Sequence, residues 1–145
     1  MSKPDIPTRQ DYPQFYPITT RWSDNDIYGH VNNVTYYSYF DTVANRYLIE
    51  EGGLDIGDGQ IVGYVVNSAC QYHTPIAYPE TVTAGLRVDR LGNSSVQYGI
   101  AIFRDGCDTA AAHGQFVHVF VDRARGASVP IPAELRDALQ RLLRD

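Results

Sequence analysis

The sequence predicts an α+β fold in which a curled antiparallel sheet of about five strands wraps around one long helix. Two patterns lead to this prediction. Apolar and aromatic residues recur with helical spacing over residues 36–48, and four runs of strand-like sequence follow after residue 60. A helix with one broad apolar stripe and a sheet with one apolar face cover each other, so each buries its apolar surface.

The long helix is expected to begin after Asn32 and Asn33, because asparagine is a favoured residue at helix starts. Its apolar residues recur every three or four positions, which is the spacing of one buried helix face. They are Tyr36, Tyr37, Phe40, Val43, Ala44, Tyr47 and Leu48. Gly52 and Gly53 are expected to end the helix.

Four later segments have the composition and the alternation of β-strands. They cover residues 61–72, 81–89, 96–102 and 111–121. The middle two place apolar residues at every other position, which predicts one buried face. The first carries apolar residues on both faces, so we expect that this strand does not face solvent. Gly92-Asn93 and Asp105-Gly106 lie between the runs, where hairpin turns are expected.

Two shorter elements complete the expected fold. Residues 15–22 have the composition of a first strand, and Pro17 favours an edge or a strand start. Residues 132–143 have the pattern of a short amphipathic helix with Leu135, Leu139 and Leu142 on one side. We assign this last helix a packing role only.

Length and composition limit the classes of function. The 145 residues correspond to one domain, expected to span residues 1–145. A net charge of -5, with only 12 Lys and Arg residues, argues against a broad nucleic-acid surface. No stretch approaches the roughly 18 apolar residues of a membrane span, and the polar start lacks a signal-peptide core. Cys70 and Cys107 lack CxxC spacing and fit reduced thiols, so we expect a cytoplasmic protein.

The sequence contains none of the common motifs for phosphate binding, dinucleotide binding or a serine nucleophile. The four histidines lack the close pairing of a zinc site, and we predict neither a metal nor a cofactor. His113 and His118 are expected to be packed or hydrogen-bonded within a strand, and His73 to be a turn residue. His30 differs, because it lies four residues after Asp26 and close to the predicted helix start.

Asp24 and Asp26 lie in the loop that leads to the long helix, followed by Gly29 and His30. A helix start offers unpaired N–H groups and the positive end of the helix dipole, which suit a carbonyl oxygen that becomes an oxyanion. The same dipole favours a carboxylate, so an aspartate here also fits a cap or a turn. Both interpretations stay open on these residues alone, and we expect at least one of the two aspartates to cap or turn.

The pattern D-x-D-x-x-G-H-V-N-N, from Asp24 to Asn33 and followed by an aromatic helix, resembles the hotdog-fold thioesterases. The resemblance is to the acyl-CoA and 4-hydroxybenzoyl-CoA thioesterase group in particular, and it extends over most of the chain. It includes residues 72–75, Pro79-Glu80, residues 90–95 and residues 129–132. The resemblance implies a hotdog fold and the hydrolysis of an acyl-CoA thioester. Benzoyl-type members have other residues at the helix start, which argues against assuming an aromatic substrate.

The resemblance also implies roles for individual residues. Asp26 falls on the catalytic carboxylate of the family, and the helix-start amide that polarises the thioester carbonyl falls on or next to Asn33. In the similar plant acyl-carrier-protein thioesterases, the histidine at the position of His30 is implicated too. Asp26 would act as a general base or attack directly, and His30 would orient Asp26 or water, or protonate the leaving thiolate. Asp24 would cap or brace the loop.

Members of this family form dimers by joining sheets edge to edge, often pairing into tetramers, so the resemblance implies a homodimer or homotetramer. Candidates for contacts to coenzyme A phosphates are Arg87, Arg90, Arg123 and Arg125, each of which also fits an ordinary surface charge. Two other functions stay open. One is an acyl-thioester hydratase or dehydratase on the same fold, whose usual helix motif is absent. The other is a non-catalytic acyl-thioester-binding module, which has no need of a carboxylate at Asp26.

Overall fold

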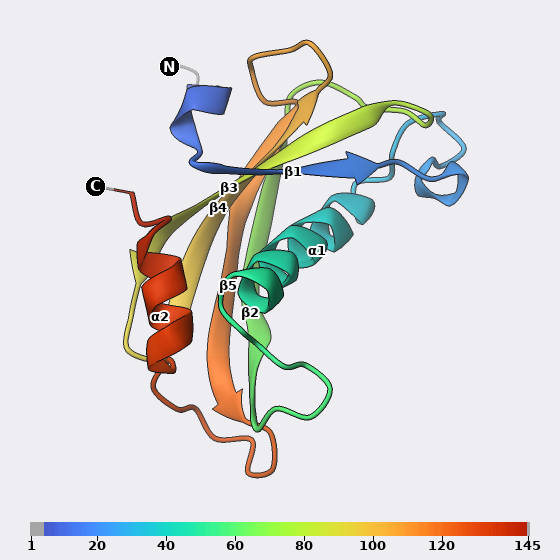
Figure 1. Ribbon diagram of the computed structural model, residues 1–145. Helices are drawn as coiled ribbons and strands as arrows, with labels where there is room; N and C mark the ends of the chain where they lie inside the picture. Colours follow the sequence, from blue (N-terminus) through green and yellow to red (C-terminus); the bar gives the residue numbers. More distant parts are fainter. Residues whose placement is uncertain (1–4, 145) are drawn as a thin grey trace.

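The computed structural model describes residues 5–144 and shows a five-stranded antiparallel sheet curled around one long helix (Figure 1). The elements in chain order are β1 (Gln14–Thr19), α1 (Thr35–Glu50), β2 (Ile61–Tyr72), β3 (Thr81–Leu91), β4 (Ser95–Arg104), β5 (Ala112–Asp122) and α2 (Ala133–Gln140). Single turns of 3-10 helix occur at Arg9–Asp11 and Trp22–Asp24. The strand order is β1-β3-β4-β5-β2, so β1 and β2 form the edges. The predicted fold class is confirmed.

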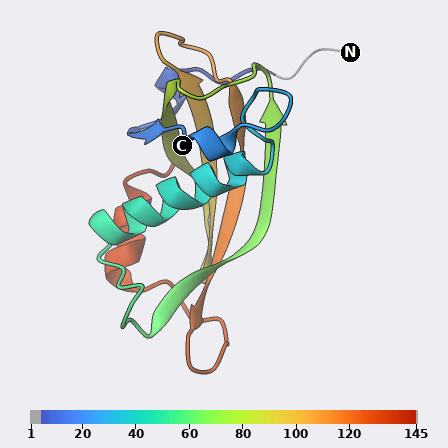
Figure 2. The same ribbon diagram turned by 90° about the vertical axis from the view of Figure 1, so that its right-hand side faces the viewer.

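The core lies between α1 and the inner face of the sheet, and the side view shows the strands bending around the helix (Figure 2). The alternating residues predicted to face the helix are fully buried. They are Val82, Ala84, Leu86 and Val88 of β3 and Val96, Tyr98, Ile100 and Ile102 of β4. Gly53 adopts a φ of 70°, a left-handed conformation that glycine tolerates, so the chain leaves α1 where the two glycines predicted.

The short helix α2 packs as predicted, with Leu135, Leu139 and Leu142 buried. The hydroxyl of Tyr47 on α1 donates a hydrogen bond of 2.6 Å to the carbonyl of Ala138 on α2. This buried bond ties the two helices together at the end of α1 that lies away from the loop before the helix.

Two boundaries differ from the prediction near that loop. The first strand ends at Thr19 instead of reaching Trp22, because Asp24 accepts hydrogen bonds from the backbone and guanidinium of Arg21 and turns the chain. The helix begins at Thr35 with Val34 at its N-cap, and no side chain caps it. Asn32 instead accepts a hydrogen bond of 2.9 Å from the Val34 N–H, which is an asparagine turn ahead of the helix.

The expectation that residues 61–72 avoid solvent is wrong for the isolated chain. β2 has the predicted bounds, but it is an edge strand that pairs only with β5. Tyr64, Val65 and Val66 are 51%, 45% and 60% exposed. Because β2 lies at the edge of the sheet, the rest of the chain does not cover its apolar residues. Within residues 5–144, no helix combines the length and the apolar character needed to cross a membrane.

Candidate functional site

A cavity of about 260 Å³ lies at the start of α1. The loop before α1 forms one side, and the end of β2 with the turn after it forms the other. The lining residues are His30, Val31, Asn33, Tyr36, Tyr72, His73, Thr74 and Pro75. The Tyr36 and Tyr72 rings pack edge to face with centroids 5.0 Å apart, so much of the wall is aromatic. Two of the three predicted site residues, His30 and Asn33, lie in this wall, and Asp26 does not.

Backbone hydrogen bonds hold the loop that carries these residues. The Asp26 N–H donates to the carbonyl of His30 at 3.0 Å, and the Gly29 N–H donates to the carbonyl of Asp26 at 3.0 Å. Gly29 has a φ of 84°, which explains the glycine at this turn. The Val31 N–H donates to the carbonyl of Ile76 at 2.7 Å and joins the loop to the turn after β2. The loop is therefore a closed turn attached to the opposite wall of the cavity.

The Asp26 carboxylate is partly buried and bound on both oxygens. Its Oδ1 accepts a hydrogen bond of 2.9 Å from the Tyr28 N–H, and its Oδ2 accepts one of 3.1 Å from the Asn32 side-chain amide. The bond from the Tyr28 N–H makes Asp26 a turn residue, which is the structural role that the sequence left open beside a catalytic one. An ionised carboxylate offers about four lone-pair positions, so each oxygen keeps capacity for water. Asn32 also binds the Val34 N–H, so a single side chain links Asp26 to the start of α1.

His30 is exposed, and its imidazole makes no hydrogen bond with any residue between 5 and 144. Its connection to Asp26 is through its backbone carbonyl alone. One of the roles that the resemblance implies for His30 is to orient Asp26, and no side-chain hydrogen bond joins the two residues in the described part of the chain. The roles predicted for the imidazole therefore stay predictions.

Asn33 lies between the closed turn and the first turn of α1. Its backbone N–H donates to no acceptor within residues 5–144, whereas its carbonyl accepts a hydrogen bond of 2.9 Å from the Tyr72 hydroxyl. An unpaired N–H at the positive end of a helix favours a negatively charged or polarised oxygen. Asn33 thus lines the cavity and has a backbone N–H without an acceptor in the described residues, and its role as the amide that polarises the carbonyl stays a prediction.

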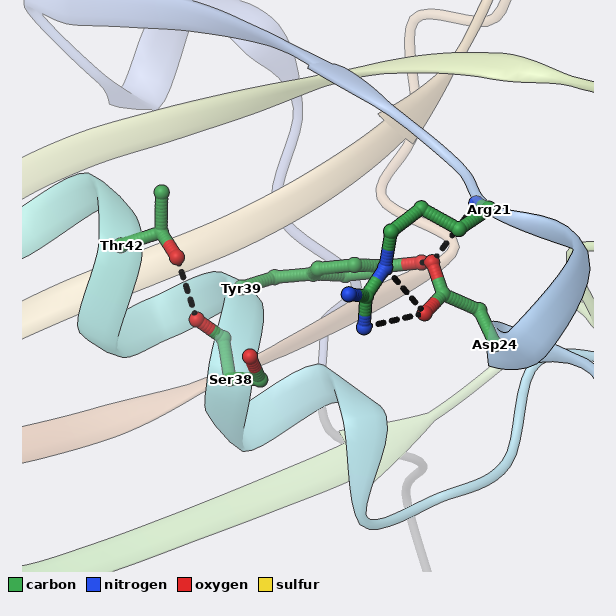
Figure 3. Close-up of polar contacts among 5 residues, drawn as sticks. All are labelled: Arg21, Asp24, Ser38, Tyr39 and Thr42. Carbon is green, nitrogen blue, oxygen red and sulfur yellow. Dashed lines mark hydrogen bonds and ion pairs between the residues drawn. The ribbon is translucent and has the colours of Figure 1, made fainter.

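Asp24 is held very differently from Asp26, and Figure 3 shows its contacts with Arg21 and Tyr39. It is 1% exposed, and its Oδ2 accepts bonds from the Tyr39 hydroxyl at 2.7 Å and the Arg21 N–H at 2.8 Å. The Arg21 guanidinium binds its Oδ1 at 3.0 Å. Burial would raise the pKa of Asp24, but the hydrogen bonds from Tyr39 and Arg21 outweigh it and lower the pKa below its usual value. The prediction that Asp24 braces the loop is confirmed.

The three remaining histidines are packed or hydrogen-bonded. His118 is buried with its Nδ1 3.1 Å from the Tyr98 hydroxyl, and burial lowers its pKa to about 4. His113 Nδ1 lies 2.8 Å from His73 Nε2, and the two rings stack. Burial, then His73 and the nearby Arg87, lower the pKa of His113. In the described residues, no three His, Cys, Asp or Glu side chains form a group that could hold a metal ion.

Most of the arginines proposed for coenzyme A phosphates have other partners. Arg87 pairs with Asp89 at 2.8 Å. Arg123 donates to the carbonyls of Ile56 and Gly57 and so braces the loop between α1 and β2. Arg125 lies 3.6 Å from Asp122. The Arg90 side chain makes no hydrogen bond or ion pair with residues 5–144, so it is the freest of the four.

Tyr36 and Tyr72 also line the cavity, although the sequence did not indicate them as parts of the site. Tyr36 was assigned to the apolar stripe, and its burial fits that assignment. Tyr72 ends β2, and a register shift between Val65 and Asn67 inverts the alternation partway along the strand. Counting alternate residues from the start of the strand therefore places Tyr72 on the wrong face.

Known proteins share this architecture. Residues 20–139 match the family model of the thioesterase-like superfamily. The solved PA5185 protein from Pseudomonas aeruginosa strain PAO1 is 58% identical, with a TM-score of 0.96 over 97% of this chain and 99% of that chain. The PA2801 protein from Pseudomonas aeruginosa, described as a candidate thioesterase, is 32% identical, with a TM-score of 0.79 over 86% of this chain and 95% of that chain.

A thioesterase from Thermus thermophilus, solved in complex with coenzyme A and Zn, is a further structural neighbour. It is 28% identical, with a TM-score of 0.74 over 89% of this chain and 98% of that chain. The hotdog fold implied by the sequence pattern is thereby confirmed.

Proposed function

Because the chain belongs to the thioesterase-like superfamily, we propose that it hydrolyses acyl-CoA thioesters to the free acid and coenzyme A. The observation that carries this proposal is the unpaired N–H of Asn33 in the cavity wall. The preceding residue, Asn32, binds the Asp26 carboxylate. A donor for an oxyanion and a carboxylate that can accept a proton therefore lie within one hydrogen-bonded segment.

In the proposed reaction, the thioester carbonyl lies against the Asn33 N–H. Water adds to the carbonyl carbon, its proton passes to Asp26, and the charge on the carbonyl oxygen is stabilised by the amide. One well-aimed donor of this kind contributes on the order of 3 kcal/mol to the transition state. The C–S bond then breaks, and the thiolate of coenzyme A takes up a proton, with His30 as the nearest imidazole in sequence.

The position of Asp26 favours the general-base route over direct attack. Its carboxylate does not line the cavity, and both of its oxygens already accept one hydrogen bond. A water molecule on a remaining lone pair reaches the thioester more readily than the carboxylate itself. The general-base role therefore fits the geometry better than a mixed anhydride.

The test is thiol release from a panel of short, medium, long and aromatic acyl-CoAs, measured for the native protein and for Asp26→Asn. The substitution keeps the shape of the side chain and removes the base. We expect kcat to fall at least ~100-fold, in line with the loss of a general base. Asp137→Asn makes the same change at an exposed residue of α2 and serves as the matched control, for which we expect native kcat.

The outcomes separate the alternatives. Equal activity of Asp26→Asn and the native protein would make Asp26 a turn residue only. If the native protein releases no thiol from the acyl-CoA panel, acyl groups on acyl-carrier protein are tested next. A protein inactive on both carriers that still binds acyl-CoA would be the non-catalytic module.

We further infer that β2 pairs with β2 of a second copy to form a homodimer. Support comes from the twelve residues of this edge strand and from the exposed Tyr64, Val65 and Val66. An exposed edge strand presents a row of unpaired backbone N–H and C=O groups that can pair with another chain. Sedimentation equilibrium at micromolar concentration is expected to give twice the chain mass of 16.2 kDa, or four times if dimers pair. A monomer at all concentrations would contradict this inference.

A further inference from the structure

Tyr72 joins the edge strand β2 to the start of α1. It is the last residue of the strand, and its hydroxyl donates to the carbonyl of Asn33 at 2.9 Å. Its ring packs edge to face on Tyr36 at 5.0 Å. The two partners are 39 residues apart in sequence and both line the cavity, so this bond connects two separate elements of its wall.

The backbone around Asn33 is fixed on both sides by other contacts. Asn32 donates its N–H to the carbonyl of Asp24 at 2.9 Å, and Val34 donates its N–H to Asn32 at 2.9 Å. Asn33 itself is exposed, and no other hydrogen bond holds it within residues 5–144. The Tyr72 hydroxyl therefore makes the one hydrogen bond to Asn33 within residues 5–144, and it holds the carbonyl of the peptide whose N–H, that of Val34, is bound by Asn32.

The precision of that contact matters because a backbone donor acts only when it is well aimed. A functional group must be held within about 0.5 Å and 10–20° of its productive geometry. Rotation about the Asn33 backbone would turn its N–H away from the carbonyl oxygen. A hydrogen bond on the carbonyl of the same residue opposes this rotation.

The phenol of Tyr72 is suited to this task over a wide pH range. Burial raises its pKa, and the neighbouring Cys70 and Tyr37 raise it further. The hydroxyl therefore keeps its proton, and remains a hydrogen-bond donor, at neutral pH and well into the alkaline range.

We propose that Tyr72 is a positioning residue for the reaction, which orients the Asn33 N–H from the end of β2 without touching the reacting atoms. This proposal rests on the proposed thioesterase function. It assigns the edge strand a part in the chemistry, in addition to its place in the sheet.

The test compares Tyr72→Phe with Tyr47→Phe. Tyr72→Phe keeps the ring against Tyr36 and removes only the hydroxyl. We expect kcat on the best acyl-CoA to fall about tenfold, with KM within about twofold, because the lost contact acts mainly in the transition state. Tyr47→Phe also removes one bond from a tyrosine hydroxyl to a backbone carbonyl, at the far end of α1. It is expected to lower the unfolding temperature and to keep native kcat.

A second measurement does not depend on activity. In ¹H–¹⁵N NMR spectra, the amides of Asn33 and Val34 should shift or broaden in Tyr72→Phe and keep their native signals in Tyr47→Phe. Unchanged signals would overturn the proposal, as would a native kcat in Tyr72→Phe or equal losses of kcat in both variants. A native protein without thioesterase activity, combined with the expected NMR changes, would refute the proposed function and leave the positioning of Asn33 by Tyr72 supported.

Discussion

The structure contains an aspartate and a histidine in each of two contrasting regions. In the core, Asp24 and His118 are each 1% exposed, and each lies within hydrogen-bonding distance of a tyrosine hydroxyl. At the cavity, Asp26 is partly buried and His30 is exposed, and no tyrosine hydroxyl binds either of them within residues 5–144. The same two residue types are thus enclosed by partners in one region and accessible to water in the other.

The loop before α1 contains one aspartate that stabilises the fold and one that is accessible for the proposed reaction. Asp24 and Asp26 are two residues apart, yet the first has its oxygens bound by Arg21 and Tyr39, whereas the second keeps lone pairs free. A buried polar group contributes to stability only while its partners are present. An accessible one costs little to change and is available to a substrate. We expect changes in the core to alter stability, and changes at the cavity to alter activity.

The largest expected effect is the loss of stability in acid through His118. Folding lowers its pKa to about 4 from the ordinary 6.5, so the unfolded chain binds a proton over this interval and the folded chain does not. Stability is therefore fully present above pH 6.5 and falls as the pH decreases toward 4. The free energy of unfolding should fall by about 3 kcal/mol over this range, at 1.36 kcal/mol per pKa unit. Urea unfolding at pH 7.5, 6, 5 and 4 measures it.

Two variants separate this effect from the other titrating groups. His118→Gln should reduce the pH dependence between 6.5 and 5, where few carboxylates titrate, and the part that remains includes His113, whose pKa folding also lowers. His30→Gln removes the exposed imidazole, which binds no residue between 5 and 144, and should keep the free energy of unfolding at pH 7.5 within about 0.5 kcal/mol of the native value. If His118→Gln retains the full slope, the core histidine is not its source, and the contrast between the two histidines fails.

A somewhat smaller effect is expected for Asp24→Asn. The amide keeps the size of the side chain but removes the charge that Arg21 and Tyr39 bind, and hydrogen bonds to charged groups contribute roughly 1.5–3 kcal/mol. We expect a loss of about 2 kcal/mol, or about 6 °C in unfolding temperature. Because folding lowers the pKa of Asp24 below 3.8, the difference from the native protein should persist above that pH and shrink below it.

Asp26→Asn is the matched variant for this measurement, since it makes the same change two residues away. Its free energy of unfolding should stay within about 0.5 kcal/mol of the native value, as for most accessible positions. Equal destabilisation by the two substitutions would show that Asp26 also belongs to the framework of the loop.

Much of the fold could be predicted because the patterns that specify it are local. The alternation in β3 and β4 and the stripe on α1 each follow from the period of one element, and the buried residues match them. The position of β2 in the sheet could not be predicted in this way. A strand with apolar residues on both faces fits either the middle of a sheet or an edge covered by another chain. The structure distinguishes these two positions, because β2 pairs with β5 and with no other strand of the described residues.

The candidate site could be predicted only where it is continuous in sequence. The order of Asp26, His30 and Asn33 along the chain predicted a loop followed by a helix start. The opposite wall comes from Tyr72 and the residues after it, some 40 positions later, and a register shift within β2 conceals its direction. The different environments of Asp24 and Asp26 also depend on Tyr39, which reaches the loop from within α1 (Figure 3).

The edge strand β2 has a consequence for how the protein behaves on dilution. One end of β2 holds the Asn33 carbonyl, while its outer edge is open to a second chain. If a partner chain steadies this strand, mass action links turnover to the total protein concentration. Specific activity would then fall once the protein is diluted below its dissociation constant, so rates measured at nanomolar and micromolar concentrations would describe different species.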